Sequence, residues 1–153
     1  MSTLKGRLAP FSLTARGSLK SKSNSRQLVY RGKKPAFIKS EGAFQFLKDF
    51  ARQCPVLDPP FMEDVMLEVD VFYPSRRTDL DISLLMDALQ GPVLENDRLV
   101  KSQVVRWGLD PLDPRVELRI RLTEYGDYAG ESMSVSMRDL LGSGIGQDRK
   151  SVV

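Results

Sequence analysis

Two stretches of this chain, far apart in the sequence, alternate strictly between apolar and polar residues. Their apolar members are Leu67, Val69, Val71 and Tyr73 in the first stretch, and Val116, Leu118, Ile120 and Leu122 in the second. A period of two sends successive side chains to opposite faces of a β-strand. The chain is therefore predicted to build a sheet with one buried face and one polar face, from strands over 66–73 and 115–123.

Further strands are expected beside these two. Residues 99–107 are predicted to form another strand of the sheet. A hairpin is predicted to pair 27–30 with 35–38 around the turn Arg31-Gly32-Lys33-Lys34.

Two segments have helical periodicity. The first covers 41–53 with Ser40 as its N-cap, and the second covers 82–90 and is closed by Gly91-Pro92. Apolar residues of the first helix are expected to form a stripe that faces the core, namely Phe44, Phe46, Leu47, Phe50 and Ala51. The aromatic part of this helix, around Phe46 and Phe50, is also a candidate contact between two copies of the chain. Together the elements predict an α+β fold, with a small mixed sheet of three to five strands, two main helices and flexible N- and C-terminal ends.

The length of 153 residues indicates one domain with its own hydrophobic core. Residues 1–20 show no period and are expected to be a basic flexible arm, followed by the folded domain over 21–125. Residues 126–153 are expected to be a poorly structured C-terminal tail, apart from a short helix near 137–141. No apolar run approaches the roughly 18 residues that cross a bilayer, so no membrane segment is expected.

The composition excludes several kinds of active site. The chain has no histidine, which removes Ser-His-Asp and Cys-His nucleophilic sites, histidine zinc sites and a histidine general base. Cys54 is the only cysteine, so no disulfide can form within the chain, as expected of a protein in a reducing cytoplasm. Any chemistry must therefore rest on carboxylates, lysine, arginine, tyrosine, hydroxyls and a bound metal.

Charge is strongly segregated along the chain. Residues 1–40 hold ten Lys and Arg and no acid, whereas residues 41–153 hold 13 Lys and Arg against 20 acids. Such segregation is typical of a protein that binds a polyanion such as nucleic acid, although a solvated basic tail is the alternative. In the basic segment we expect DNA contacts from Lys22, Arg26, Lys33, Lys34 and Lys39.

Acids are concentrated in one short stretch. Five carboxylates fall within 19 residues, directly after Arg76-Arg77, at Asp79, Asp81, Asp87, Glu95 and Asp97. Acids packed that closely repel one another unless a positive charge sits among them. Oxygen-only clusters suit a hard cation such as Mg²⁺ or Mn²⁺, and an arginine pair suits a phosphate. The stretch therefore points to metal-assisted phosphodiester chemistry.

The same acids have a purely structural interpretation. Thr78 followed by Asp81 is close to a capping box, and acids in a first helical turn complement the helix dipole. If Asp79 and Asp81 were helical, they would lie about 200° apart and could not share an ion, whereas at the end of a strand they would converge. Asp87 can be an exposed helix acid, and Asp97 can belong to a turn. The pattern leaves both interpretations open.

The order of these residues resembles that of the RusA-type Holliday junction resolvases, small endonucleases associated with phages and prophages. The resemblance rests on Arg76-Arg77-Thr78-Asp79-Leu80-Asp81, on Asp87-Ala88-Leu89 in the following helix, and on Asn96-Asp97 before a strand. Upstream, Ser23-Asn24-Ser25 and residues 37–42 are similar to the family's N-terminal loop and strand-to-helix junction. The similarity covers about residues 21–123, so it implies a RusA-like nuclease domain over 21–125.

This resemblance implies a homodimer of mixed α/β protomers, each with a site that depends on Mg²⁺ or, as a substitute, Mn²⁺. It would make Asp79, Asp81 and Asp97 the metal-binding and catalytic acids. The expected substrate is branched DNA, a four-way junction above all, in the cytoplasm of a bacterium or of a phage-infected host cell. Further expected DNA contacts are Asn24, Arg76, Arg77 and Lys101.

The chain departs from the family pattern in the second helix. The family's catalytic lysine lies in this helix, but residues 83–86 contain none. Lys39, Lys101 or Arg77 would have to supply its charge.

Three functions remain open, of which the remotest is a phage interaction or structural protein whose basic arm meets an acidic partner. One of the other two is a structure-selective endodeoxyribonuclease that resolves branched DNA by paired nicks during recombination and repair. The second is a DNA-binding protein without catalysis, in which the basic segment binds and the acids cap a helix.

Overall fold

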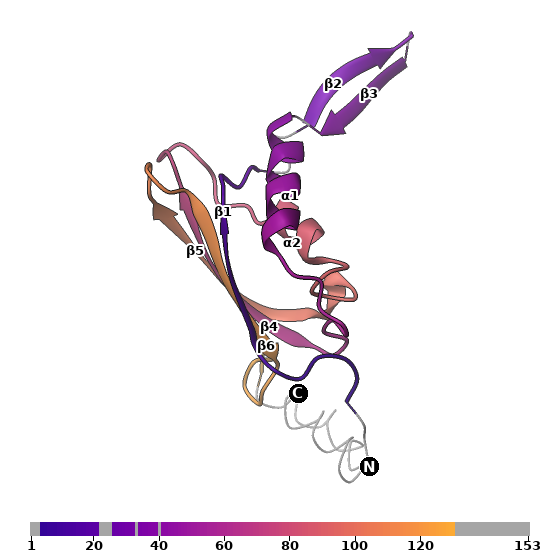
Figure 1. Ribbon diagram of the computed structural model, residues 1–153, viewed down its shortest axis with the longest axis vertical. Helices are drawn as coiled ribbons and strands as arrows, with labels where there is room; N and C mark the ends of the chain where they lie inside the picture. The colour runs from indigo at the N-terminus through magenta and orange to yellow at the C-terminus, as the bar shows by residue number, and fades with distance from the viewer. Residues whose placement is uncertain (1–3, 22–25, 33, 40, 131–153) are drawn as a thin grey trace.

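The structure is a computed structural model, and it describes residues 4–21, 26–32, 34–39 and 41–130 (Figure 1). Several expectations made from the sequence fall outside these residues: the DNA contacts Lys22, Asn24 and Lys33, the N-cap Ser40, the C-terminal tail from residue 131 on, and the short helix near 137–141 within it. The side chains of Arg26 and Lys39 also lie outside the description, although the backbone there is placed.

A mixed sheet of four strands forms the centre of the molecule, in the order β1 (Phe11–Arg16), β6 (Arg115–Leu122), β4 (Val65–Tyr73) and β5 (Val100–Leu109). β6 is antiparallel to both of its neighbours, whereas β4 and β5 are parallel. Because parallel strands need a crossover, the chain between them passes through α2 (Ser83–Leu89) and the short 3₁₀ helix η2 (Asp97–Leu99). The predicted α+β fold is confirmed.

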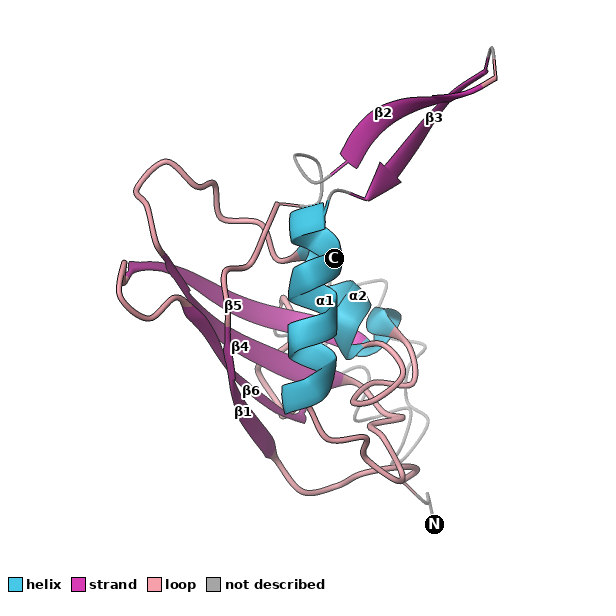
Figure 2. Ribbon diagram, turned by 45° about the horizontal axis from the view of Figure 1, so that its top comes forward, coloured by secondary structure: helices cyan, strands magenta, loops and turns pink. Residues whose placement is uncertain are grey.

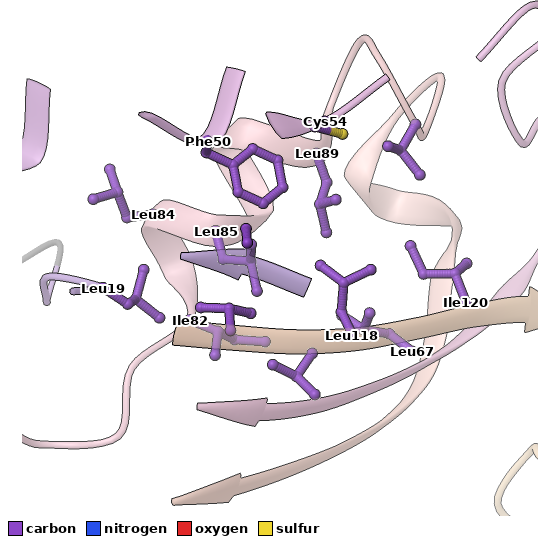
Figure 3. Close-up of a cluster of buried hydrophobic side chains, with 14 of the residues drawn as sticks. Leu19, Phe50, Cys54, Leu67, Ile82, Leu84, Leu85, Leu89, Leu118 and Ile120 are labelled. Carbon is purple, nitrogen blue, oxygen red and sulfur yellow. The ribbon is translucent and has the colours of Figure 1, made fainter. Parts of the chain in front are cut away.

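Both helices cover the same face of the sheet, α1 (Glu41–Gln53) lying alongside α2 (Figures 1 and 2). The alternation predicted for β4 is confirmed, because the side chains on its helix-facing side are fully buried. Figure 3 shows Phe50, Leu84, Leu85 and Leu89 of the helices meeting Leu67, Leu118 and Ile120 of the sheet. Burial of this apolar surface is the main stabilising contribution to the fold.

Helix α1 has the predicted bounds, but its core stripe is rotated from the prediction. The buried residues are Ala43, Phe46 and Phe50, while Phe44 is 54% exposed and Ala51 is exposed. Spacings of three and four residues place Ala43, Phe46 and Phe50 on one side of the helix. Phe44 follows Ala43 directly, so its side chain lies about 100° around the helix axis from that of Ala43. Phe46 and Phe50 belong to the core, and a contact between two copies along this helix stays a prediction.

The expectation of a flexible arm over residues 1–20 is wrong for its second half. β1 pairs with β6 along its whole length, from Phe11 opposite Ile120 to Arg16 opposite Arg115. Phe11, Ala15 and the following Leu19 are buried in the core. Apolar residues do alternate in this strand, but they are only three and one of them is alanine, so the period is weak.

The hairpin predicted in the basic segment is present as a separate two-stranded sheet. β2 (Arg26–Arg31) and β3 (Lys34–Lys39) are antiparallel, with Gly32 in the left-handed region at φ 68°. The hairpin projects away from the sheet and the two helices (Figures 1 and 2). In the sequence, the hairpin lies between Ser21 and the start of α1. In the described part of the chain, no helix has the length and apolar character needed to span a bilayer.

The sheet face away from the helices carries a network of ion pairs. Arg106 on β5 donates to Asp70 at 2.5 Å and to Glu68 at 2.6 Å. Arg119 on β6 reaches the same acids, at 2.8 Å and 3.2 Å. Both acids lie on β4, so the network joins three neighbouring strands.

Candidate functional site

Asp79 and Asp81 lie in a non-helical segment at the carboxyl end of β4. The strand ends at Tyr73, a turn follows over 74–77, and α2 begins only at Ser83. The indole Nε1 of Trp107 donates to the carbonyl oxygen of Thr78 at 3.0 Å and so holds this segment against β5. The helical arrangement that would have separated the two carboxylates is therefore absent.

Both carboxylate oxygens of Asp81 accept hydrogen bonds from serines. Its Oδ1 accepts hydrogen bonds from the backbone N–H of Ser83 at 2.9 Å and from the Ser83 hydroxyl at 2.7 Å. Its Oδ2 accepts a hydrogen bond from the hydroxyl of Ser21 at 3.0 Å. The first two bonds support the first turn of α2, and the third joins this loop to the segment that leads into the hairpin.

The hydroxyl of Tyr73 shows that the two aspartates share one region. The backbone N–H of Asp81 donates to this hydroxyl at 3.4 Å. The pKa of Tyr73 is raised above its ordinary value, mainly because its side chain is buried, and the negative charges of Asp81 and Asp79 raise it further. Both carboxylates thus act on the same phenol at the end of β4.

A pocket of about 580 Å³ opens beside Asp79. It is bounded by three parts of the chain, which are residues 18–21, the first turn of α1 at Gly42, and the loop 74–79. Lys20 and Arg77 line it from opposite segments and are both exposed. The pocket therefore combines two cations, hydroxyl groups and one carboxylate at the base of the basic hairpin.

Asp97 lies elsewhere. It begins η2, directly before β5, and its backbone N–H donates to the side chain of Gln90 at 3.3 Å. Because β5 is parallel to β4, the start of β5 lies beside Val65, at the end of β4 opposite to Tyr73. Nine residues of strand separate these two ends, about 26 Å at roughly 3.3 Å per residue.

The three acids therefore do not come together within the chain. Among the described residues, no group of three acids or cysteines could hold a metal ion. Mg²⁺ is commonly held by one or two carboxylates together with substrate phosphates and water, and Asp79 and Asp81 are the two acids that this loop offers to such an ion. The predicted centre of three carboxylates is not present among the described residues.

The predicted basic contacts divide between two ends of the molecule. Arg76 and Arg77 are exposed in the turn after β4, and Lys34 is exposed in the hairpin. Lys101 is exposed at the start of β5, near Asp97 and away from the pocket. Lys101 therefore lies on a different part of the surface from Arg76 and Arg77.

Two residues of this region were not singled out from the sequence. Lys20 lines the pocket and Ser21 is 8% exposed, yet both fell within a stretch interpreted as polar loop and flexible arm. One sequence feature that could have indicated a buried segment here is Leu19, an apolar residue beside a run of Ser and Lys.

Comparison with known proteins adds no identification. The sequence matches no known family model, and no curated protein is significantly similar to it.

Proposed function

We propose that the protein is an endonuclease that binds branched DNA and hydrolyses phosphodiester bonds with Mg²⁺ or Mn²⁺. The observation that carries this proposal is the grouping of Asp79 and Asp81 with Lys20 and Arg77 at the foot of a basic hairpin. The resemblance to the RusA-type resolvases, which rests on the Asp-Leu-Asp run and its flanking residues, supports the same assignment. Asp97 stays outside the proposed site.

The chain's own residues have distinct roles in this proposal. Asp79 and Asp81 would hold the ion, which when bound polarises a phosphate and helps to ionise water. Ser21 and Ser83 hold the carboxylate of Asp81 in one orientation through their hydroxyls. Arg77 supplies positive charge where a phosphate gains negative charge during reaction.

The basic segment supplies affinity for the DNA backbone in this proposal. Lysines and arginines that contact phosphates bind DNA without regard to sequence, and their binding weakens with salt. The hairpin carries Arg26, Arg31, Lys34 and Lys39 and projects from the body of the protein. A homodimer would present two such sites to opposed strands of a junction, and paired nicks would follow.

Nicking of a synthetic four-way junction tests the proposal. Wild-type protein should nick labelled strands when Mg²⁺ or Mn²⁺ is present and should lose this activity with EDTA. Asp79→Asn and Asp81→Asn should each lower the rate by at least about tenfold, which is roughly 1.4 kcal/mol in the barrier. Glu124→Gln is the control, because Glu124 is 73% exposed and lies in the turn after β6. Equal nicking by wild type and Asp81→Asn would refute the assignment.

A DNA-binding protein without catalysis is the second candidate. It is favoured by the hydrogen bonds of Asp81, whose two carboxylate oxygens both accept from serines at the start of α2 and before the hairpin. Calorimetric titration with Mn²⁺ separates the candidates. An endonuclease should bind the ion at a defined stoichiometry that Asp79→Asn reduces, whereas a helix cap should show no such binding.

A further inference from the structure

The proposed site needs a cation close to the aspartates, and α2 does not provide one. Its sequence, Ser83–Leu89, contains no lysine or arginine, and Leu84, Leu85 and Leu89 are buried in the core. Positive charge must therefore come from segments that pack around the loop 74–82. Two exposed cations line the pocket there, Lys20 and Arg77.

The position of Lys20 is set by its two neighbours. Leu19 is 1% exposed in the core, and Ser21 is 8% exposed and hydrogen-bonded to Asp81. A residue between two buried neighbours has a defined backbone position, even in a loop. Lys20 lies in the loop after β1, and its side chain lines the pocket. The bond from Ser21 also fixes Lys20 relative to the aspartate loop.

Gly42 provides the room for this lysine. A Cβ atom placed on Gly42 would lie 3.2 Å from Cε of Lys20 and within 3.8 Å of two further atoms of its stem. The aliphatic part of Lys20 thus lies against the first turn of α1, while its ammonium group is left to a ligand in the pocket. Arg77 lines the pocket from the turn after β4.

We propose that this pocket receives a backbone phosphate of DNA, with Lys20 and Arg77 as its two cationic contacts. Lys20 thereby supplies the positive charge that α2 lacks. This inference rests on the proposed function for its substrate class, and it adds a residue and a binding position that the sequence did not indicate. Two cations from separate segments also offset the two carboxylates, which would otherwise repel a phosphate.

Salt-dependent binding tests the inference without any cleavage. Fluorescence anisotropy of a labelled four-way junction is measured in EDTA at several salt concentrations, with the full chain. Each phosphate contact contributes about 0.9 to the slope of log K against log salt. Lys20→Gln and Arg77→Gln should each reduce that slope by about one, and the double variant by about two.

Two variants control for charge and folding. Lys48→Gln removes the same charge from an exposed position on α1 outside the pocket, and its slope should equal that of wild type. Lys20→Arg keeps the charge and should restore the slope lost in Lys20→Gln. A Lys20→Gln slope that equals the Lys48→Gln slope would overturn the inference, as would wild-type protein that fails to bind the junction.

The two proposals can fail separately. If wild type does not nick DNA with Mg²⁺ or Mn²⁺ but Lys20→Gln reduces the slope, the endonuclease proposal is wrong and the phosphate pocket stands. If wild type nicks DNA and Lys20→Gln leaves the slope unchanged, only the pocket is wrong.

Discussion

The hydroxyl of Ser21 donates a hydrogen bond of 3.0 Å to Oδ2 of Asp81, a residue 60 positions further along the chain. This bond joins the segment before the basic hairpin to the loop that holds both aspartates. A hydrogen bond to an ionised group is among the stronger ones in proteins. DNA bound by the hairpin would therefore act on the same short segment that orients the carboxylate of Asp81.

Asp81→Ala removes the acceptor for the backbone N–H and hydroxyl of Ser83 and for the hydroxyl of Ser21. We expect a loss of at least about 1 kcal/mol in the free energy of unfolding, as for a lost hydrogen bond to a charged group, and a smaller loss for Asp81→Asn, which keeps one oxygen acceptor. Urea unfolding followed by circular dichroism measures both. Asp79→Ala, two positions away and exposed, is the control and should stay within about 0.5 kcal/mol of wild type. Equal losses at both positions would show that the hydrogen bonds of Asp81 do not stabilise the fold.

Leu19→Ala tests whether the second half of the N-terminal segment belongs to the core. Leu19 is 1% exposed, so the substitution should lower the free energy of unfolding by about 2–5 kcal/mol. Leu8→Ala, in the same segment but 56% exposed, should change it by less than about 0.5 kcal/mol. Thermal and urea unfolding measure the two variants, and a flexible arm would give two equally small effects.

Asp70→Asn tests the network on the open face of the sheet. Hydrogen bonds from Arg106 and Arg119 hold the pKa of Asp70 below its usual range, because they favour the ionised form. A lowered pKa stabilises the folded protein fully above the pKa of the same carboxyl in the unfolded chain, which is about 4. This stabilisation is lost as the pH falls through the pKa in the folded protein. Wild type should therefore exceed Asp70→Asn in stability at pH 6, and the difference should shrink toward pH 3.

Urea unfolding at a series of pH values measures that difference. Glu124→Gln serves as the control, because Glu124 is largely exposed and lies outside the network. The difference in unfolding free energy between Glu124→Gln and wild type should not shrink toward pH 3. A constant offset for Asp70→Asn across the series would show that the network does not stabilise the ionised carboxylate.

The thiol of Cys54 should react slowly in the folded protein. Burial raises its pKa to about 11 from 9.0, so at pH 8 the folded protein holds about one hundredth of the thiolate of an unfolded chain. Ellman's reagent should label native protein slowly and denatured protein fast. Because Cys54 is the only cysteine, the rate reports this site alone. Equal rates in both states would contradict its burial.

Elements with strong periodicity were predicted well from the sequence. The strand that ends at Tyr73 and the helix over Glu41–Gln53 were found with bounds within a residue of those expected. Their apolar residues are numerous and large, so the period of two or of 3.6 is visible without any structure. β1 was missed because Ala15 and a short run between Pro10 and Gly17 give little signal.

The candidate site was predicted in part. The sequence left open whether Asp79 and Asp81 converge at the end of a strand or separate in a helical turn, and the structure shows that the backbone between them is not helical. The grouping with Asp97 depended on the path of the crossover, which local pattern does not determine. Lys20 was overlooked for the same reason, since only the tertiary contact with Gly42 brings it to the pocket.

The pairing of β1 with β6 has a consequence for how the protein forms as it is synthesised. β1 is made before the other strands of its sheet, yet its partner β6 is the last of them, about a hundred residues later. β1 therefore stays unpaired until the rest of the sheet has emerged, and closure of so long a loop delays its pairing. During synthesis, the earliest strand of this sheet is thus among the last to be incorporated.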